Sequence, residues 1–115
     1  MIPKFMKKKL TIFLSLKLFL YIFLIFFFQK IYADEAYNKG KEIFLGDGNC
    51  ASCHSLADAG SNGDIGPNLN EIQPELSRVI MAVKNGIGVM PAYEGILTDK
   101  EIELVSKYVS ESSLK

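Results

Sequence analysis

The sequence predicts a small all-α domain with three main helices, placed after an apolar N-terminal leader. Two stretches of the C-terminal half carry apolar residues at helical spacing, and residues that commonly begin or end helices flank them. No run of Val and Ile typical of a strand follows Cys53, and no internal repeat follows the leader. The chain of 115 residues suffices for one such domain.

Residues 1–33 have the parts of a secretory signal peptide. The lysines Lys7 to Lys9 precede an apolar run from Leu10 to Phe28, and Ala33 is a small residue just before the expected cut. The run approaches the ~20 residues that a transmembrane helix needs, so an uncleaved membrane anchor is the alternative. Lys17 interrupts the run and favours the cleaved signal. In both cases the domain that follows lies outside the cytoplasm.

Residues 34–115 form the expected mature domain, which is acidic. Six of the thirteen basic residues lie in the leader and all thirteen acidic residues follow it, which leaves the domain a net charge of −6. This charge argues against nucleic acid as a partner, and a membrane is expected only if the leader is retained. Only Phe44 of the eight phenylalanines remains, so a domain of this size needs a disulfide, a metal or a cofactor.

Start and stop signals delimit the three predicted helices. The first covers residues 34–45, with acidic residues at its start and Gly46 at its end. The second runs from near Pro74 to the C-terminal stop Asn85-Gly86. The third begins at a capping box, Thr98 to Glu101.

The apolar residues of the second and third helices fall on one face of each helix, which predicts core packing rather than a functional surface. In the second helix these residues are Leu76, Val79, Ile80 and Val83, and in the third they are Ile102, Val105, Tyr108 and Val109. Between the first two helices, residues 58–66 are rich in Gly, Asp, Asn and Ser, and they predict a solvated loop.

The only two cysteines and the only histidine lie within five positions, in Cys50-Ala51-Ser52-Cys53-His54. A disulfide here would close a very short loop and constrain little of the unfolded chain. A thioredoxin-like pair needs a preceding strand, but Gly46-Asp47-Gly48 precedes this one. A zinc site needs four ligands, and the chain has neither a second cysteine pair nor a second histidine.

Covalent haem attachment accounts for all three residues. Two thiols one helical turn apart can each add to a vinyl group of one haem, and the histidine after the second cysteine can then point its imidazole at the iron. The motif therefore predicts one haem c, with Cys50 and Cys53 as attachment sites and His54 as an iron ligand.

A haem iron in an electron carrier usually has a second axial ligand, and Met opposite His raises the reduction potential. The mature chain offers Met81 and Met90. Met81 lies in the second predicted helix, where we expect a core methionine. Met90 follows two glycines and precedes Pro91, in a loop that can hold a thioether against the iron. Met90 is therefore the predicted second ligand.

The motif Gly66-Pro67-Asn68 lies after the histidine. Metal-bound histidines normally donate their other ring N–H to an acceptor, and the Pro67 carbonyl is the predicted acceptor, with an ordinary turn as the alternative. Tyr93 and Arg78 are candidates for hydrogen bonds to the haem propionates. For them, the alternatives are a partly buried tyrosine and a solvated helix arginine.

The segments CASCH, GPN and NGIGVMPAY, with the C-terminal helix, resemble the class I c-type cytochromes over about Glu35 to Val109. The resemblance implies the small class I cytochrome c fold, three main helices around one covalent haem, with the first and third crossing near Gly40, Phe44 and Tyr108. It also implies the site residues: Cys50 and Cys53 for attachment, His54 and Met90 as axial ligands, and Pro67 as the partner of the histidine. The chain is similar to short bacterial carriers, to cytochrome subunits of sulfite dehydrogenases and to soluble photosynthetic cytochromes.

The resemblance implies a one-electron carrier and not an enzyme, located in the periplasm or, alternatively, in a thylakoid lumen. The expected partners of this monomer are redox proteins, with a dehydrogenase or complex as donor and an oxidase or photosystem as acceptor. Ile87, Val89 and Ala92 are the expected docking patch. A haem subunit fixed to a dehydrogenase, for example of the sulfite dehydrogenase type, is the alternative. A haem enzyme or ligand binder needs an open iron, which Met90 disfavours.

Overall fold

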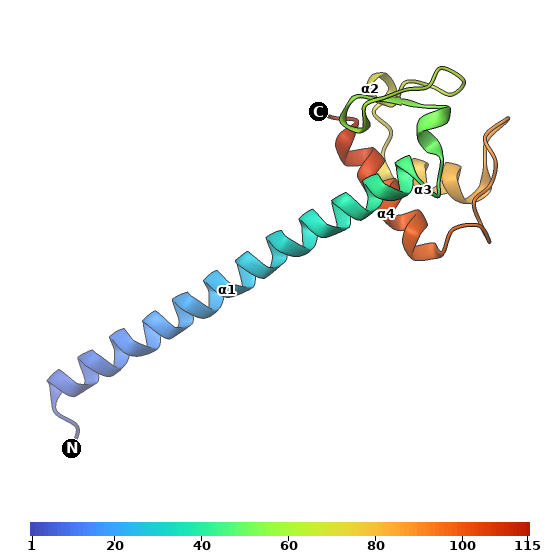
Figure 1. Ribbon diagram of the computed structural model, residues 1–115. Helices are drawn as coiled ribbons and strands as arrows, with labels where there is room; N and C mark the ends of the chain where they lie inside the picture. The colour runs from blue at the N-terminus through green and yellow to red at the C-terminus, as the bar shows by residue number, and fades with distance from the viewer. The chain divides into compact units, whose positions relative to one another are not determined.

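The computed structural model describes residues 1–115 and divides into two compact units, Met1–Asp34 and Glu35–Lys115. The helix α1 runs from Lys4 to Leu45 and supplies nearly all of the first unit (Figure 1). The apolar side chains of the first unit are exposed. By length and hydropathy α1 could cross a membrane, and a signal sequence at this position meets the same criteria. Cleavage after Ala33 stays a prediction.

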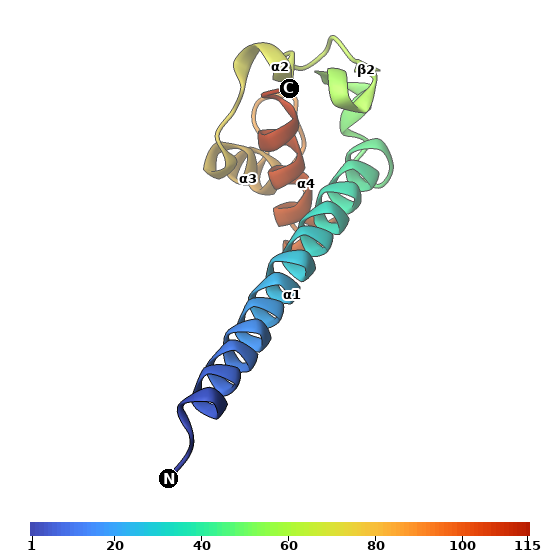
Figure 2. The ribbon, with the colours of Figure 1, turned by 90° about the vertical axis from the view of Figure 1, so that its left-hand side faces the viewer.

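The second unit is built mainly of helices, as predicted. After the last turns of α1 it contains α2 (Leu69–Ile72), α3 (Leu76–Asn85) and α4 (Asp99–Ser112). Two 3-10 helices, η1 (Cys50–Ser52) and η2 (Ala57–Ala59), and two short strands, β1 (Ser55–Leu56) and β2 (Ser61–Asn62), lie between α1 and α2. Figures 1 and 2 both show α3 and α4 side by side, and they place the C-terminus near α2.

The predicted helix signals are present in the structure. Thr98 and Glu101 form the capping box of α4: Thr98 Oγ1 accepts from the Glu101 backbone N–H at 3.2 Å, and Glu101 Oε2 accepts from the Thr98 backbone N–H at 2.8 Å. The helix α3 begins two residues after Pro74 and ends at Asn85, and the next residue, Gly86, has a φ of 74° that suits glycine. These signals set the ends of α3 and α4 to within two residues. The predicted start of the first helix at residue 34 was wrong, because α1 continues from the apolar leader without a break and ends at Leu45 as predicted.

The crossing of α1 and α4 occurs at the predicted residues. A Cβ atom on Gly40 would lie only 2.6 Å from Tyr108 Cβ, so the close approach requires glycine. The ring of Tyr108 meets Phe44 edge to face at a centroid distance of 5.7 Å, and it meets Tyr37 at 5.0 Å. Both geometries are favourable for aromatic pairs.

The core of the second unit contains side chains from α1, α2, α3 and α4, together with Leu56 of β1 and Leu97. Its buried apolar members are Ile43, Phe44, Leu56, Leu69, Val79, Val83, Leu97, Ile102, Val105, Tyr108 and Val109. The predicted face of α4 is confirmed in full. On α3 the prediction was wrong for Leu76, which is 40% exposed because it lies at the first position of the helix, and Ile80 is only partly buried.

The prediction of a solvated loop over residues 58–66 was wrong in part. The strands β1 and β2 pair antiparallel, with Ser55 opposite Asn62 and Leu56 opposite Ser61. Ser61 is buried, and Asp58 accepts a hydrogen bond from the buried Tyr108. The polar groups of this segment form hydrogen bonds within the hairpin and with distant residues such as Tyr108. Amino-acid composition alone does not predict these pairings.

Candidate haem-attachment site

A single tight turn places the two cysteines and the histidine. The helix η1 begins after Asn49, whose φ of 46° lies in the left-handed region that Asn tolerates. The backbone N–H groups of Cys53 and His54 both donate to the Cys50 carbonyl, at 3.1 Å and 2.9 Å. The thiols of Cys50 and Cys53 are free, partly buried and one turn apart. This is the arrangement that attachment to two vinyl groups of one haem needs.

The Cys50 thiol packs against the preceding segment. Its Sγ lies 3.5 Å from the Gly48 carbonyl oxygen, and a Cβ on Gly48 would lie 3.0 Å from that sulfur. Burial raises the pKa of Cys50 to about 11, and the neighbouring Cys53 adds a smaller increase. The thiol is therefore protonated at neutral pH. Disulfide exchange requires a thiolate, and the raised pKa of Cys50 disfavours the thiolate at that sulfur.

The hydrogen bond predicted for His54 is present. His54 Nδ1 lies 2.9 Å from the Pro67 carbonyl oxygen. Because a carbonyl only accepts, Nδ1–H donates, and Nε2 is the ring nitrogen whose lone pair can bind a metal. The Gly66 N–H donates to the Cys53 carbonyl at 2.7 Å, which holds the Pro67 segment against the motif.

Two glycines allow this close packing: Gly63, which the sequence reasoning did not single out, and Gly66, which it named only as part of the Gly66-Pro67-Asn68 motif. A Cβ on Gly63 would lie 2.6 Å from the His54 backbone nitrogen, and a Cβ on Gly66 would lie 2.7 Å from His54 Nδ1. The segment after the motif therefore lies directly on the backbone and ring of His54. The available signal was the Gly content of residues 58–66, but that segment, rich in Gly, Asp, Asn and Ser, predicted only a solvated loop.

Met90 ends a two-residue turn, whereas Met81 lies on the surface of α3. The backbone N–H of Met90 donates to the Ile87 carbonyl at 2.9 Å, and Gly88 takes the positive φ of 57° that such hairpin turns favour. The Met90 side chain is partly buried against the core.

The prediction of a core methionine at position 81 was wrong, since Met81 is 62% exposed. It lies two residues from Val79 and two from Val83, both buried. Two residues correspond to about 200° around a helix, so Met81 points away from their face.

The two candidates for propionate contacts have different surroundings. The Tyr93 hydroxyl donates to the Gly48 carbonyl at 2.6 Å, and the ring packs against the core. Burial raises the pKa of Tyr93. Arg78 is exposed on α3. The role of both residues at the propionates stays a prediction.

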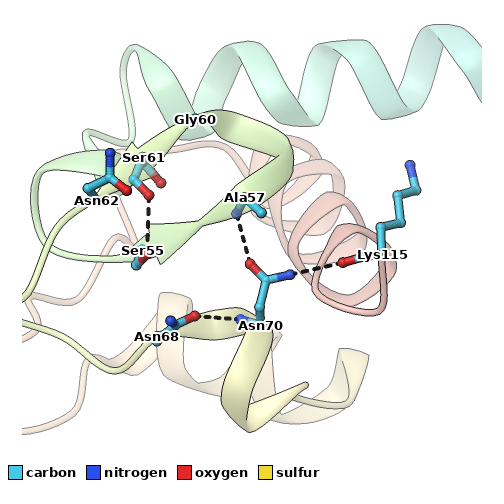
Figure 3. Close-up of a pocket in the computed structure, with 8 residues that line it drawn as sticks. All are labelled: Ser55, Ala57, Gly60, Ser61, Asn62, Asn68, Asn70 and Lys115. Atoms are coloured by element: carbon cyan, nitrogen blue, oxygen red, sulfur yellow. Dashed lines mark hydrogen bonds between the residues drawn. The ribbon is translucent and has the colours of Figure 1, made fainter.

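A separate polar cavity of about 420 Å³ lies beside the hairpin (Figure 3). Asn70 bridges its wall: Oδ1 accepts from the Ala57 N–H at 2.8 Å, and Nδ2 donates to the Lys115 carbonyl at 3.4 Å. Its lining consists of Ser55, Ala57, Gly60, Ser61, Asn62, Asn68, Asn70 and Lys115. Cys50, Cys53, His54 and Met90 do not line this cavity. Its polar lining also does not suit the apolar macrocycle of a haem.

Comparison with known proteins identifies the family. Residues 35–109 match the family model described as cytochrome C oxidase, cbb3-type, subunit III. The chain is 33% identical to a cytochrome c6 of Pyropia yezoensis over 118 residues, 96% of this chain and 98% of that one. It is 38% identical to a cytochrome c6 of Tetradesmus obliquus over 80 residues, 61% of this chain and 83% of that one.

A solved structure agrees in both sequence and fold. The crystal structure of the c-type cytochrome SorU from Sinorhizobium meliloti superposes with a TM-score of 0.66, at 52% identity, over 70% of this chain and 93% of that one. The matched range of the family model, residues 35–109, includes the cysteine motif and the Met90 turn. The chain therefore belongs to the small class I c-type cytochromes, electron carriers that hold a covalently bound haem c.

Proposed function

We propose that the protein is a monomeric one-electron carrier outside the cytoplasm, with its haem attached to Cys50 and Cys53 and its iron bound by His54 and Met90. The observation that carries the proposal is the 2.9 Å hydrogen bond from His54 Nδ1 to the Pro67 carbonyl. This bond fixes the tautomer in which Nε2 is free to bind a metal.

The donor set fits a haem c. Two free thiols stand one turn apart, and an imidazole with an available nitrogen follows directly. When bound, the haem supplies an iron that cycles between the ferric and ferrous states. The side chains of this chain attach the macrocycle, orient the imidazole and shield the site. The small core, with Phe44 and Tyr108 as its fully buried aromatic residues, also suits a domain completed by a large apolar group.

Met90 is favoured over Met81 as the second ligand. Met90 packs against the core from a turn, whereas Met81 is largely exposed on α3. A thioether opposite an imidazole raises the reduction potential. The hydrogen bond to Pro67 makes the imidazole more basic, which favours ferric iron and therefore acts in the opposite direction. Bound together, His54 and Met90 would leave the iron no open position for substrate chemistry.

The surface beside Met90 suits brief contacts with redox proteins. Ile87 and Val89 are 67% and 89% exposed, and Ala92 is exposed as well. The apolar patch Ile87, Val89 and Ala92 is therefore available for docking. The acidic mature domain favours partners with a basic face, because complementary charge speeds encounter.

The second candidate, a haem subunit fixed to a dehydrogenase, uses the same site but a larger interface. It is favoured by the exposure of further apolar side chains in the second unit: Ile65, Ile72, Ile96 and Leu114. A fixed subunit co-purifies with its enzyme, whereas a free carrier elutes alone as a monomer on size-exclusion chromatography.

Optical spectra of the exported protein test the proposal. We expect a pyridine haemochrome typical of thioether-linked haem, a low-spin reduced form and a weak near-infrared Met–iron band in the oxidised form. The band should be lost in Met90→Ala and kept in the matched control Met81→Ala. A band that survives Met90→Ala would exclude this ligand, and a high-spin ferrous form that binds carbon monoxide would indicate an open iron.

A further inference from the structure

Tyr93 connects the Met90 turn to the segment that carries the cysteines. It lies three residues after Met90, and its hydroxyl donates a 2.6 Å hydrogen bond to the Gly48 carbonyl. Gly48 lies two residues before Cys50 and is buried. A short hydrogen bond to a buried carbonyl is costly to break, because the carbonyl would lose its partner without gaining water.

The other hydrogen bonds of the turn lead elsewhere. The Tyr93 backbone N–H donates to the Val83 carbonyl of α3 at 2.9 Å, and Met90 and Ile87 bond to each other. Ile96 and Leu97 donate to the Tyr93 carbonyl. Of the hydrogen bonds made by residues 86–97, only that of the Tyr93 hydroxyl reaches the cysteine segment.

Haem attachment does not remove the hydrogen bond between the Tyr93 hydroxyl and the Gly48 carbonyl. In the free thiol form, the Gly48 carbonyl lies near two donors, the Tyr93 hydroxyl at 2.6 Å and Cys50 Sγ at 3.5 Å. When the thiol adds to a vinyl group, its hydrogen moves to the vinyl carbon and the sulfur becomes a thioether that cannot donate. Tyr93 is then the only one of the two that can satisfy the Gly48 carbonyl.

We propose that Tyr93 is a positioning residue that keeps Met90 on the iron by fastening the Met90 turn to Gly48. The inference rests on the proposed function, since it takes Met90 as the ligand. Pro91 stiffens the chain between Met90 and Tyr93, so a displacement of the tyrosine is passed to the methionine. Without the hydroxyl, backbone hydrogen bonds hold the turn to α3 alone, and Met90 leaves the iron more often.

Tyr93→Phe tests the inference in the haem-loaded protein, because it removes the hydroxyl and keeps the ring. Imidazole binds ferric iron only when the methionine has left, so its affinity reports the open population. The loss of one hydrogen bond should tighten imidazole binding roughly three- to tenfold. The near-infrared Met–iron band should weaken and the reduction potential should fall.

Tyr108→Phe is the matched control. It removes the hydroxyl of another core tyrosine, which bonds to Asp58 rather than to Gly48. This variant should lower the melting temperature while leaving the imidazole affinity, the band and the potential as in the wild type.

Two outcomes would overturn the inference in distinguishable ways. If the wild type shows the Met–iron band and Tyr93→Phe binds imidazole with wild-type affinity, Tyr93 does not position Met90, while the proposed function stands. If the wild type lacks the band, or Met90→Ala retains it, Met90 is not the ligand and the inference fails together with the proposed ligand set.

Discussion

The Tyr108 hydroxyl donates a 2.9 Å hydrogen bond to Asp58 Oδ2, which joins α4 to the segment just after the haem motif. Lys41 Nζ lies 3.2 Å from the same oxygen, and Lys115 Nζ lies 3.8 Å from Oδ1. Burial alone would raise the pKa of Asp58, but the hydrogen bonds from Tyr108 and Lys41 outweigh it and hold the pKa below its ordinary value. The ionised carboxylate therefore stabilises the fold.

Asp58→Asn should change the dependence of stability on pH. Because the folded-state pKa of Asp58 lies below its unfolded value of about 3.9, its contribution is present above that pH and is lost as pH falls through the folded-state pKa. At neutral pH we expect the variant to lose about 1–3 kcal/mol of unfolding free energy. In acid, the difference from the wild type should shrink. Urea unfolding of the variant and the wild type at neutral and at acidic pH measures the two differences in unfolding free energy.

Asp64→Asn is the control for this comparison, because Asp64 is exposed and makes no hydrogen bond or salt bridge with another side chain. Its stability should follow that of the wild type at every pH. A gap between Asp58→Asn and the wild type that persists unchanged in acid would contradict the assignment.

Gly40→Ala should separate α1 from α4. The new Cβ would lie 2.6 Å from Tyr108 Cβ and close to the Leu104 carbonyl, so the helices must move apart or the rings must shift. We expect a loss of about 1–3 kcal/mol, although alanine is the better helix former. Asn38→Ala on an exposed position of α1 is the control and should be neutral or slightly stabilising. Thermal unfolding compares the two, and equal melting temperatures would exclude a tight crossing.

Sequence reasoning succeeded where a local rule operates. The helix stop at Gly86, the capping box of Thr98 and the hydrogen bond from His54 to Pro67 were all predicted, because each depends on residues close in sequence or on one chemical requirement. Exposure of Met81 and burial of Ser61 were not predicted. Both depend on which elements pack together, and that information is spread over the whole chain.

Two contacts of the site were not predicted from the sequence, for a related reason. Tyr93 bonds to Gly48 across 45 positions, and nothing near either residue marks the pairing. Gly66 was recognised only as part of a turn motif. Its role against the His54 ring becomes visible when the ring and the backbone are placed together.

Removal of the haem should destabilise the domain strongly. Ligands that bind only the folded state stabilise it, and the buried apolar core of the second unit is small for its length. In a Cys50→Ala/Cys53→Ala variant without attached haem, we expect far-ultraviolet circular dichroism to show a large loss of helix at 25 °C. Cys53→Ala, which keeps one attachment site, should lie between this variant and the wild type. A cooperative unfolding transition at the wild-type temperature in the double variant would contradict the expectation.

Gly66→Ala should disturb His54 without removing either cysteine. Its Cβ would lie 2.7 Å from His54 Nδ1 and 3.0 Å from Nε2, so the ring must tilt and its hydrogen bond to Pro67 must lengthen. We expect covalent haem to be retained, with a larger high-spin fraction and an altered reduction potential. Gly60→Ala is the control, because its φ of 64° strains an alanine while no atom lies within 4 Å of the new Cβ. The control should lose about 1 kcal/mol of stability and keep the wild-type spectrum. If both variants show the wild-type spin state and potential, Gly66 does not set the orientation of the imidazole.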